Sequence, residues 1–178
     1  MDVLYHASSN KELSIIEPRA ETKRDEKEGP VVFATHDKAF ASCFLVRTDD
    51  SWTQGLRYSS DEHPTVHIFC ITDEERFRKN DKGGAIYYVP GEGFFRDHDK
   101  SYFEWVNPSA AIPIKKELYD SGLDAMIEHG VIVYFCDKNI SQQIRKVVQD
   151  PTLVARLLKD LVSENEKRGL ENQMKRYY

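Results

Sequence analysis

Short apolar runs separated by polar turns follow one another along most of the chain, and this pattern predicts a β-rich domain. The runs are rich in valine, isoleucine, phenylalanine and tyrosine, and glycine, proline, asparagine or serine residues bound them. This composition, in runs this short, is typical of β-strands. The strands that we expect lie at residues 3–8, 31–35, 56–58, 65–71, 85–89, 102–106, 111–114 and 131–136.

A helical spacing of apolar positions replaces this pattern in a few segments. Residues 38–46 are rich in alanine, and Phe40 and Phe44 fall on one face of the helix expected there. Asp150 and Pro151 supply an N-cap and a first-turn proline for a last helix, in which leucine and valine recur at helical spacing. The remaining helical segments that we expect lie at 73–77, 122–130 and 140–148.

These elements together predict an α+β fold. We expect two packed, mostly antiparallel sheets that form a cleft, with short flanking helices and a C-terminal helix pair. Residues 1–150 are expected to form one domain, and 151–178 a helix that packs on it or extends from it. The charged segment 19–29 has no apolar period, so an exposed connector is the favoured interpretation and a lid is the alternative.

Composition and charge narrow the classes of function. The chain has 178 residues, of which 40% are hydrophobic, and no apolar run approaches the ~18 residues of a membrane span. Its start lacks the pattern of a secretory signal, so we expect a cytoplasmic location. The net charge of -5 argues against a broad nucleic-acid surface, which would need clustered lysine and arginine.

Cysteine and histidine positions do not indicate a disulfide framework or a metal site. Cys43, Cys70 and Cys136 are widely spaced among apolar neighbours and are interpreted as small buried hydrophobic residues. His63 and His67 on one strand would lie more than about 13 Å apart at ~3.3 Å per residue, too far for one ion. A dyad of Cys43 with a histidine is conceivable, but nothing nearby suggests a lowered thiol pKa.

Two segments carry candidate chemistry. The first expected strand ends in His6, followed by the small residues Ala7 and Ser8, as in one wall of a binding cleft. Glu104 lies in an otherwise aromatic and apolar strand, where a charge costs free energy unless it is paired, hydrated or used. A carboxylate at a sheet edge, in water or bridged to a lysine, is the alternative for Glu104. Glu92 is a competing acidic candidate, although its glycine neighbours suggest a turn.

The ordered segments Leu-Tyr-His-Ala-Ser at 4–8, Val-Phe-Ala-Thr at 32–35 and Phe-Glu-Trp-Val-Asn at 103–107 resemble the ADP-ribosyltransferase superfamily. The likeness is to the His-Tyr-Glu branch, which includes diphtheria-toxin-like enzymes and the poly-ADP-ribose polymerases. It spans roughly residues 3–136 as a pattern of strands and includes Phe44, eleven positions after Phe33. The resemblance implies an ADP-ribosyltransferase-like domain that uses NAD as its substrate and needs no metal.

The resemblance also implies roles for individual residues. His6 would hydrogen-bond the adenosine ribose of NAD, and the backbone at Ala7, with Ser8 beside it, would hold the nicotinamide amide. Phe33 and Phe44 would flank the nicotinamide ring. Glu104 would bind the nicotinamide ribose and stabilise the positive charge that develops as the glycosidic bond breaks. His6 and Glu104 are thus the implied catalytic pair.

The sequence departs from the family pattern in ways that leave two functions open. Ala7 replaces the usual glycine, Phe33 replaces the signature tyrosine, and Tyr102 stands where arginine-modifying members have Glu or Gln, which disfavours an arginine acceptor. One function is transfer of ADP-ribose to a protein, nucleic acid, small molecule or water. The other is a domain of this fold that has lost turnover and binds NAD, another nucleotide or a protein partner.

Overall fold

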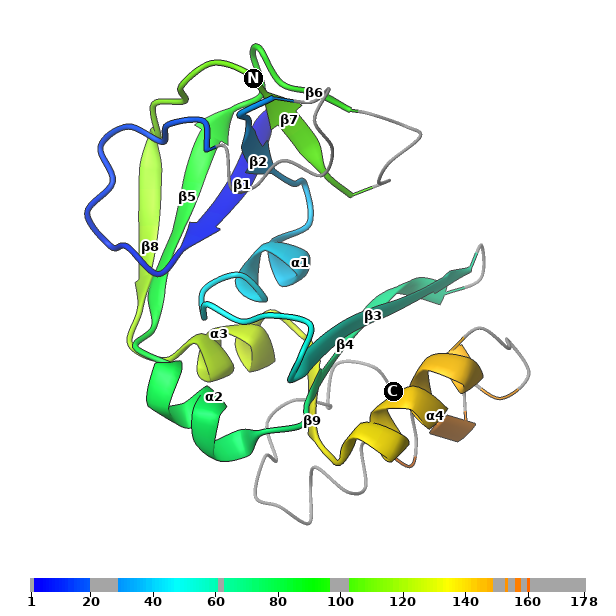
Figure 1. Cartoon of the computed structure of the whole chain (residues 1–178). Helices are drawn as coiled ribbons and strands as arrows, with labels where there is room; N and C mark the ends of the chain where they lie inside the picture. Colours follow the sequence, from blue (N-terminus) through cyan, green and yellow to red (C-terminus); the bar gives the residue numbers. More distant parts are fainter. Residues whose placement is uncertain are drawn as a thin grey trace.

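Figure 1 shows the computed structural model, which describes residues 2–19, 29–60, 63–96 and 103–148, and four helical positions, 153, 156, 157 and 160. The strands are β1 (Val3–Ser8), β2 (Val32–Ala34), β3 (Thr53–Ser60), β4 (His63–Ile71), β5 (Gly84–Pro90), β6 (Phe95–Arg96), β7 (Trp105–Asn107), β8 (Lys115–Tyr119) and β9 (Ile132–Phe135). The helices are α1 (Lys38–Ser42), α2 (Glu74–Asn80), α3 (Gly122–Glu128) and α4 (Lys138–Val148).

The expected α+β class is confirmed, and the described strands pair mostly antiparallel. They form three sheets, in the orders β1-β5-β8, β2-β7-β6 and β3-β4-β9, and only β4 and β9 run parallel among the described pairs. We expected two sheets. The number is three because β1 and β2 are joined by a single bridge, in which the backbone amides of Tyr5 and Thr35 each donate to the other residue's carbonyl, at 2.7 and 3.0 Å.

Strand alternation gives the β1-β5-β8 sheet and the adjoining β2 two distinct faces. Leu4, Val32, Ala34 and Tyr87 are buried together on one face, which we call the Tyr87 face. On the opposite face, Ile86 packs with Leu45 and Ala125 from the region of α1 and α3, and we call this the α1 face (Figure 1). Successive residues of a strand point to opposite faces, so each strand residue can be assigned to one of the two.

The β3-β4-β9 sheet is also covered on both faces. Phe69 and Val133 pack with Phe77 of α2 and Met126 of α3 on one side. On the other side Ile68, Cys70 and Ile132 pack with Ile144 of α4. Figure 1 places α1 between the two upper sheets and the β3-β4 hairpin. Helix α1 therefore faces both the two upper sheets and the β3-β4 hairpin.

The N-terminus of α3 depends on a close approach that only glycine allows. The carboxylate of Asp81 accepts the amides of Gly122 and Leu123 at 2.6 and 3.0 Å. A β-carbon at position 122 would lie 2.4 Å from a methyl carbon of Val46. Since such a contact is sterically forbidden, the glycine lets α3 pack against the segment after α1.

Several predicted boundaries differ from the structure. Strand β8 was not expected, because its Lys-Lys-Glu-Leu-Tyr sequence has little apolar content; it lies at a sheet edge, where one face can stay polar. Strand β7 begins at Trp105 rather than at 102, so Glu104 lies just outside it. Helix α1 ends at Ser42, earlier than the expected end at 46, while α2 extends to Asn80, beyond the expected end at 77.

Three other expectations lie wholly or largely outside the described residues. These are the lid or connector within 19–29, the position of Tyr102, and the packing of the last helix, for which four helical positions are described. Among the described residues, no helix is long and apolar enough to cross a membrane.

Candidate functional site

His6 is held at the junction of the first two strands. Its Nδ1 lies 2.7 Å from the backbone carbonyl oxygen of Phe33 on β2. Because a carbonyl can only accept, Nδ1 carries the proton and Nε2 is left as an acceptor in the neutral ring. Burial lowers the pKa of His6, and the charge of Arg19 acts in the same direction. The imidazole is therefore neutral near pH 7, with Nε2 available to accept a hydroxyl proton.

The imidazole of His6 also interrupts the ladder between β1 and β2. A ladder continued from the bridge between Tyr5 and Thr35 would next pair Ala7 with Phe33. The carbonyl of Phe33 instead accepts from His6, and the pairing does not continue. Since the N–H and C=O of Ala7 point to the same side of β1 as those of Tyr5, they face the place where β2 departs. The backbone of Ala7 thus presents one hydrogen-bond donor, its N–H, and one acceptor, its C=O, on this side of β1.

The strand register brings Phe33 and Glu104 to neighbouring positions. Strand β2 pairs with β7 antiparallel, with Phe33 opposite Val106 and Ala34 opposite Trp105. Glu104 directly precedes Trp105, the first paired residue of β7. Two strand spacings, about 10 Å in total, separate β1 from β7 across the sheet. His6 and Glu104 thus belong to one group of adjacent strands.

His6 and Phe33 nevertheless point to different faces. His6 is paired with Tyr87 and its ring lies 6.4 Å from the Tyr87 ring, so it belongs to the Tyr87 face. Phe33, between the buried Val32 and Ala34, points to the α1 face. Glu104 lies just before the first residue of β7, so strand alternation does not assign its side chain to either face. A ligand that touches the side chains of both His6 and Phe33 would have to cross the opening between β1 and β2.

Phe44 belongs to an aromatic group at the end of α1. Its side chain is exposed, and its ring lies 5.1 Å from that of Phe40. The Phe40 ring in turn stacks on His67 of β4 at 5.7 Å, and it lies 6.1 Å from Phe103. We call Phe40, Phe44, His67 and Phe103 the Phe103 cluster. It lies next to Glu104 in the chain and joins α1 to the β3-β4 hairpin.

Polar groups border the Phe103 cluster. Nε2 of the buried His67 lies 2.7 Å from a carboxylate oxygen of Asp37, which also caps α1 by accepting the Phe40 amide. Burial would raise the pKa of Asp37, but the hydrogen bond and charge of His67 together with the backbone amides of Phe40 and Ala39 outweigh it, and the pKa is lowered. The guanidinium of Arg57 stacks over the Phe103 ring at 4.6 Å. Phe103, the residue before Glu104, is thus packed between Arg57 and the rings of the cluster.

A charged network on the α1 face anchors α1 to the first sheet. Lys38 donates to Glu117 at 2.5 Å and to the hydroxyl of Tyr88 at 2.6 Å. Glu117 also accepts from Tyr88, from Lys115 at 3.0 Å and from Tyr119 at 3.1 Å. Partial burial alone would raise the pKa of Glu117, yet these hydrogen bonds lower it to about 2. The network sets the position of α1 and with it that of the Phe103 cluster.

Cys43 is expected to be chemically inert in the folded protein. Burial raises the pKa of its thiol to about 12, and the nearby charge of Asp37 adds to the effect. Because the thiolate is the reactive form, iodoacetamide at pH 8 should alkylate Cys43 at least about tenfold more slowly in the native chain than in urea. Peptide mass spectrometry over time measures both rates; equal rates would contradict the expectation.

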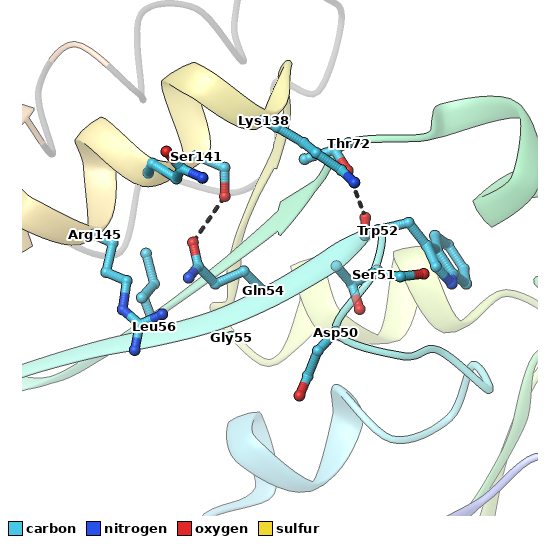
Figure 2. A pocket seen from close by; sticks show the side chains of 12 residues that line it. Asp50, Ser51, Trp52, Gln54, Gly55, Leu56, Thr72, Lys138, Ser141 and Arg145 are labelled. Atoms are coloured by element: carbon cyan, nitrogen blue, oxygen red, sulfur yellow. Dashed lines mark hydrogen bonds between the residues drawn. The ribbon is translucent and has the colours of Figure 1, made fainter.

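A cavity of about 530 Å³ lies away from His6 and Glu104, between β3 and α4 (Figure 2). Its walls are mostly polar. They include Asp50, Gln54 and Gly55 from the β3 side and Lys138 and Arg145 from α4. No sequence pattern indicated this site, because its walls come from segments some 85 positions apart.

The described residues contain no group of three or more side chains suited to hold a metal ion. In comparisons with protein-family models, with curated proteins and with solved structures, nothing matches this chain.

The structure adds residues that the sequence did not single out. His67 was considered only as half of an unsuitable metal pair. Asp37, Arg57 and Phe103 had no assigned role in a functional site. Their association depends on contacts between α1, the β3-β4 hairpin and the segment before β7, which no local pattern encodes. The pairing of Glu104 with aromatic neighbours was the one available signal.

Proposed function

We propose that the protein binds NAD and transfers its ADP-ribose group to an acceptor, with the cleft formed around β1, β2 and the Phe103 cluster. The observation that carries the proposal is the interrupted ladder at Ala7, where the His6 imidazole takes the carbonyl of Phe33. A carboxamide needs one hydrogen-bond donor and one acceptor. The Ala7 backbone offers both on the side from which β2 departs, which suits the nicotinamide amide.

The remaining residues suit the rest of the dinucleotide. The neutral His6 offers Nε2 to a ribose hydroxyl, and Ser8 lies on the same strand face. Phe33 and the exposed Phe44 both lie toward α1, and aromatic faces favour a cationic pyridinium ring. Glu104 is a carboxylate held beside the Phe103 cluster. These are the groups that a NAD site needs: an acceptor for sugar hydroxyls, a stacking surface and a negative charge.

The proposed reaction breaks the bond between C1′ of the ribose and the nicotinamide nitrogen. The electron pair of this bond leaves with nicotinamide, which becomes neutral. The acceptor oxygen or nitrogen forms the new bond to C1′ and loses a proton. Glu104 contributes a fixed negative charge near the ribose as positive charge develops on it, an effect we expect to be comparable to the ~3–4 kcal/mol lost when a charge-stabilising hydrogen-bond donor is removed from an enzyme.

A NAD-binding domain without turnover is the second candidate. The observation that favours it is that His6 and Phe33, two of the proposed NAD-binding residues, point to different faces of their strands. Two substitutions also favour this candidate. Ala7 and Phe33 replace the family's glycine and tyrosine, while the stacking surface is retained. This candidate shares the binding residues of the first and differs in the fate of NAD.

Replacing His6 by alanine is expected to weaken NAD binding about tenfold, because a hydrogen bond to the sugar and the support of Phe33 are both lost. Titration calorimetry with NAD measures the change. His36→Ala is the control, since this imidazole is 44% exposed, lies 3.5 Å from Asp2 and packs edge to face on Trp105.

Nicotinamide release, followed by liquid chromatography, then separates the two candidates. Binding with release supports the transferase, and binding without release under varied acceptors supports the binding domain. If the parent protein shows no saturable NAD binding, or if His6→Ala and His36→Ala bind NAD equally well, the proposed site is wrong.

A further inference from the structure

Strand β3 lies at the edge of its sheet, and part of its backbone faces outward. The amide of Thr72 donates to the carbonyl of Trp52 at 2.9 Å, so this pair is hydrogen-bonded across the hairpin. Hydrogen-bonded pairs alternate along an antiparallel ladder, which directs Gln54 and Leu56 toward β4. The N–H and C=O groups of Gly55 therefore point away from β4. In the described part of the sheet, β3 has no neighbour on that side.

Gly55 has no local structural reason to be glycine. Its φ is not in the left-handed region, and the register shift of this hairpin lies farther along, between Tyr58 and Ser60. A β-carbon at position 55 would meet only a ring carbon of Phe69, at 4.0 Å, an ordinary contact. Glycine inside a strand also marks places where a ligand or another backbone approaches closely. Gly55 lines the cavity, and without a side chain it leaves the outward-facing N–H and C=O groups at this edge uncovered.

The wall opposite this edge carries positive charge. Lys138 and Arg145 both line the cavity and stand seven positions apart on α4, about 10 Å along the helix. Neither forms an ion pair with a described acidic residue, and Asp50 on the β3 side is the acidic residue of the described lining. The described lining therefore carries a net positive charge in a chain whose overall charge is -5.

The cationic wall is held in place. Gln54 and Ser141 lie 2.8 Å apart (Figure 2), and the Gln54 amide nitrogen faces Ser141 because the Ser141 carbonyl, 3.2 Å away, can only accept. The Gln54 oxygen then accepts from the guanidinium of Arg145 at 3.3 Å. On the other side, Trp52 is fixed by Thr72 and by its own indole bond to Asp49 at 2.9 Å. Arg145 on one side of the groove and Trp52 on the other are thus held in place before any ligand arrives.

From these observations we infer that the groove between β3 and α4 binds an extended acidic peptide segment of a partner protein, which adds to the edge of β3. Alternating backbone donors and acceptors at the edge match another peptide backbone, and acidic side chains match Lys138 and Arg145. A small anion would use the cations but not the strand edge. The inference does not depend on the proposed NAD site, whose residues do not line the cavity.

The test uses the full chain and a fluorescein-labelled peptide, acetyl-Thr-Glu-Val-Glu-Val-Glu-Thr-amide. Fluorescence anisotropy should show saturable binding that the double variant Lys138→Glu/Arg145→Glu weakens about tenfold or more. Lys146→Glu is the matched control, since Lys146 is an exposed lysine of the same helix that does not line the cavity. It should change the affinity less than about twofold.

Methylation of alternate backbone nitrogens in the peptide should remove binding, because it blocks pairing with β3 while keeping the charges. If the methylated peptide binds as well as its parent, or if inorganic phosphate at millimolar concentration displaces the peptide completely, the groove is an anion site and the inference is wrong. Absence of saturable binding by the parent protein would also overturn it. Loss of NAD binding in the charge-reversed variant would show that the two sites are not separate.

Discussion

Replacing Glu104 by glutamine is expected to reduce NAD consumption by a factor of about 10²–10³ while leaving the affinity for NAD nearly unchanged. Glutamine keeps the size and hydrogen-bonding capacity of the side chain but removes its negative charge. That charge matters mainly when the ribose becomes cationic, so kcat should fall and KM should not. Nicotinamide release under saturating NAD measures the first quantity, and titration calorimetry of NAD binding checks the second.

Glu92→Gln is the matched control for this experiment. Glu92 is exposed and lies in the turn after β5, next to Gly93, whose φ of 80° requires a glycine-type conformation. It is the other acidic residue that the sequence offered for the cleft, and its replacement should leave turnover unchanged. A loss of turnover in Glu92→Gln, or full turnover in Glu104→Gln, would remove Glu104 from the proposed mechanism.

The second large effect concerns stability. Glu117→Gln removes the negative charge to which Lys38, Lys115, Tyr88 and Tyr119 donate hydrogen bonds. We expect the free energy of unfolding at pH 7 to fall by about 1–3 kcal/mol. The lower part of this range is favoured because the Glu117 side chain is 28% exposed and water screens the pairs. Urea denaturation measures the difference, and Glu75→Gln, an exposed position on α2, is the control.

The stability contributed by Glu117 should depend on pH in a defined window. Its pKa falls from 4.5 in the ordinary case to about 2 in the folded protein. A lowered carboxyl pKa adds stability that is fully present above the unfolded pKa and is lost as the pH falls toward the folded one. The difference between parent and Glu117→Gln should therefore shrink between about pH 4.5 and pH 2. A difference that stays constant in this range would show that the charge of Glu117 is not its source.

The sequence predicted the strands well where apolar runs are buried, as at β1, β4 and β5. It failed where a strand has a polar face: β8 carries Lys115, Lys116 and Glu117, and pairing with β5 rather than composition makes it a strand. The same limit applies to the site. His6 could be selected from the sequence, but its hydrogen bond to the carbonyl of Phe33 depends on how two strands separated by a charged loop meet.

The chain passes back and forth between the two upper sheets, β1-β5-β8 and β2-β7-β6, and the lower sheet, β3-β4-β9, and this order has a consequence for folding. The chain builds β1 and β2 in the upper sheets, crosses to β3 and β4, returns for β5 to β8, and crosses again to place β9 beside β4. Residues 68–71 thus find their parallel partners only after position 131 has been synthesised. Neither the upper sheets nor the lower sheet is made from one contiguous piece of chain that could be excised and fold alone. We expect the described body of the protein to unfold in one cooperative transition, with loss of the upper sheets and the lower sheet at the same denaturant concentration.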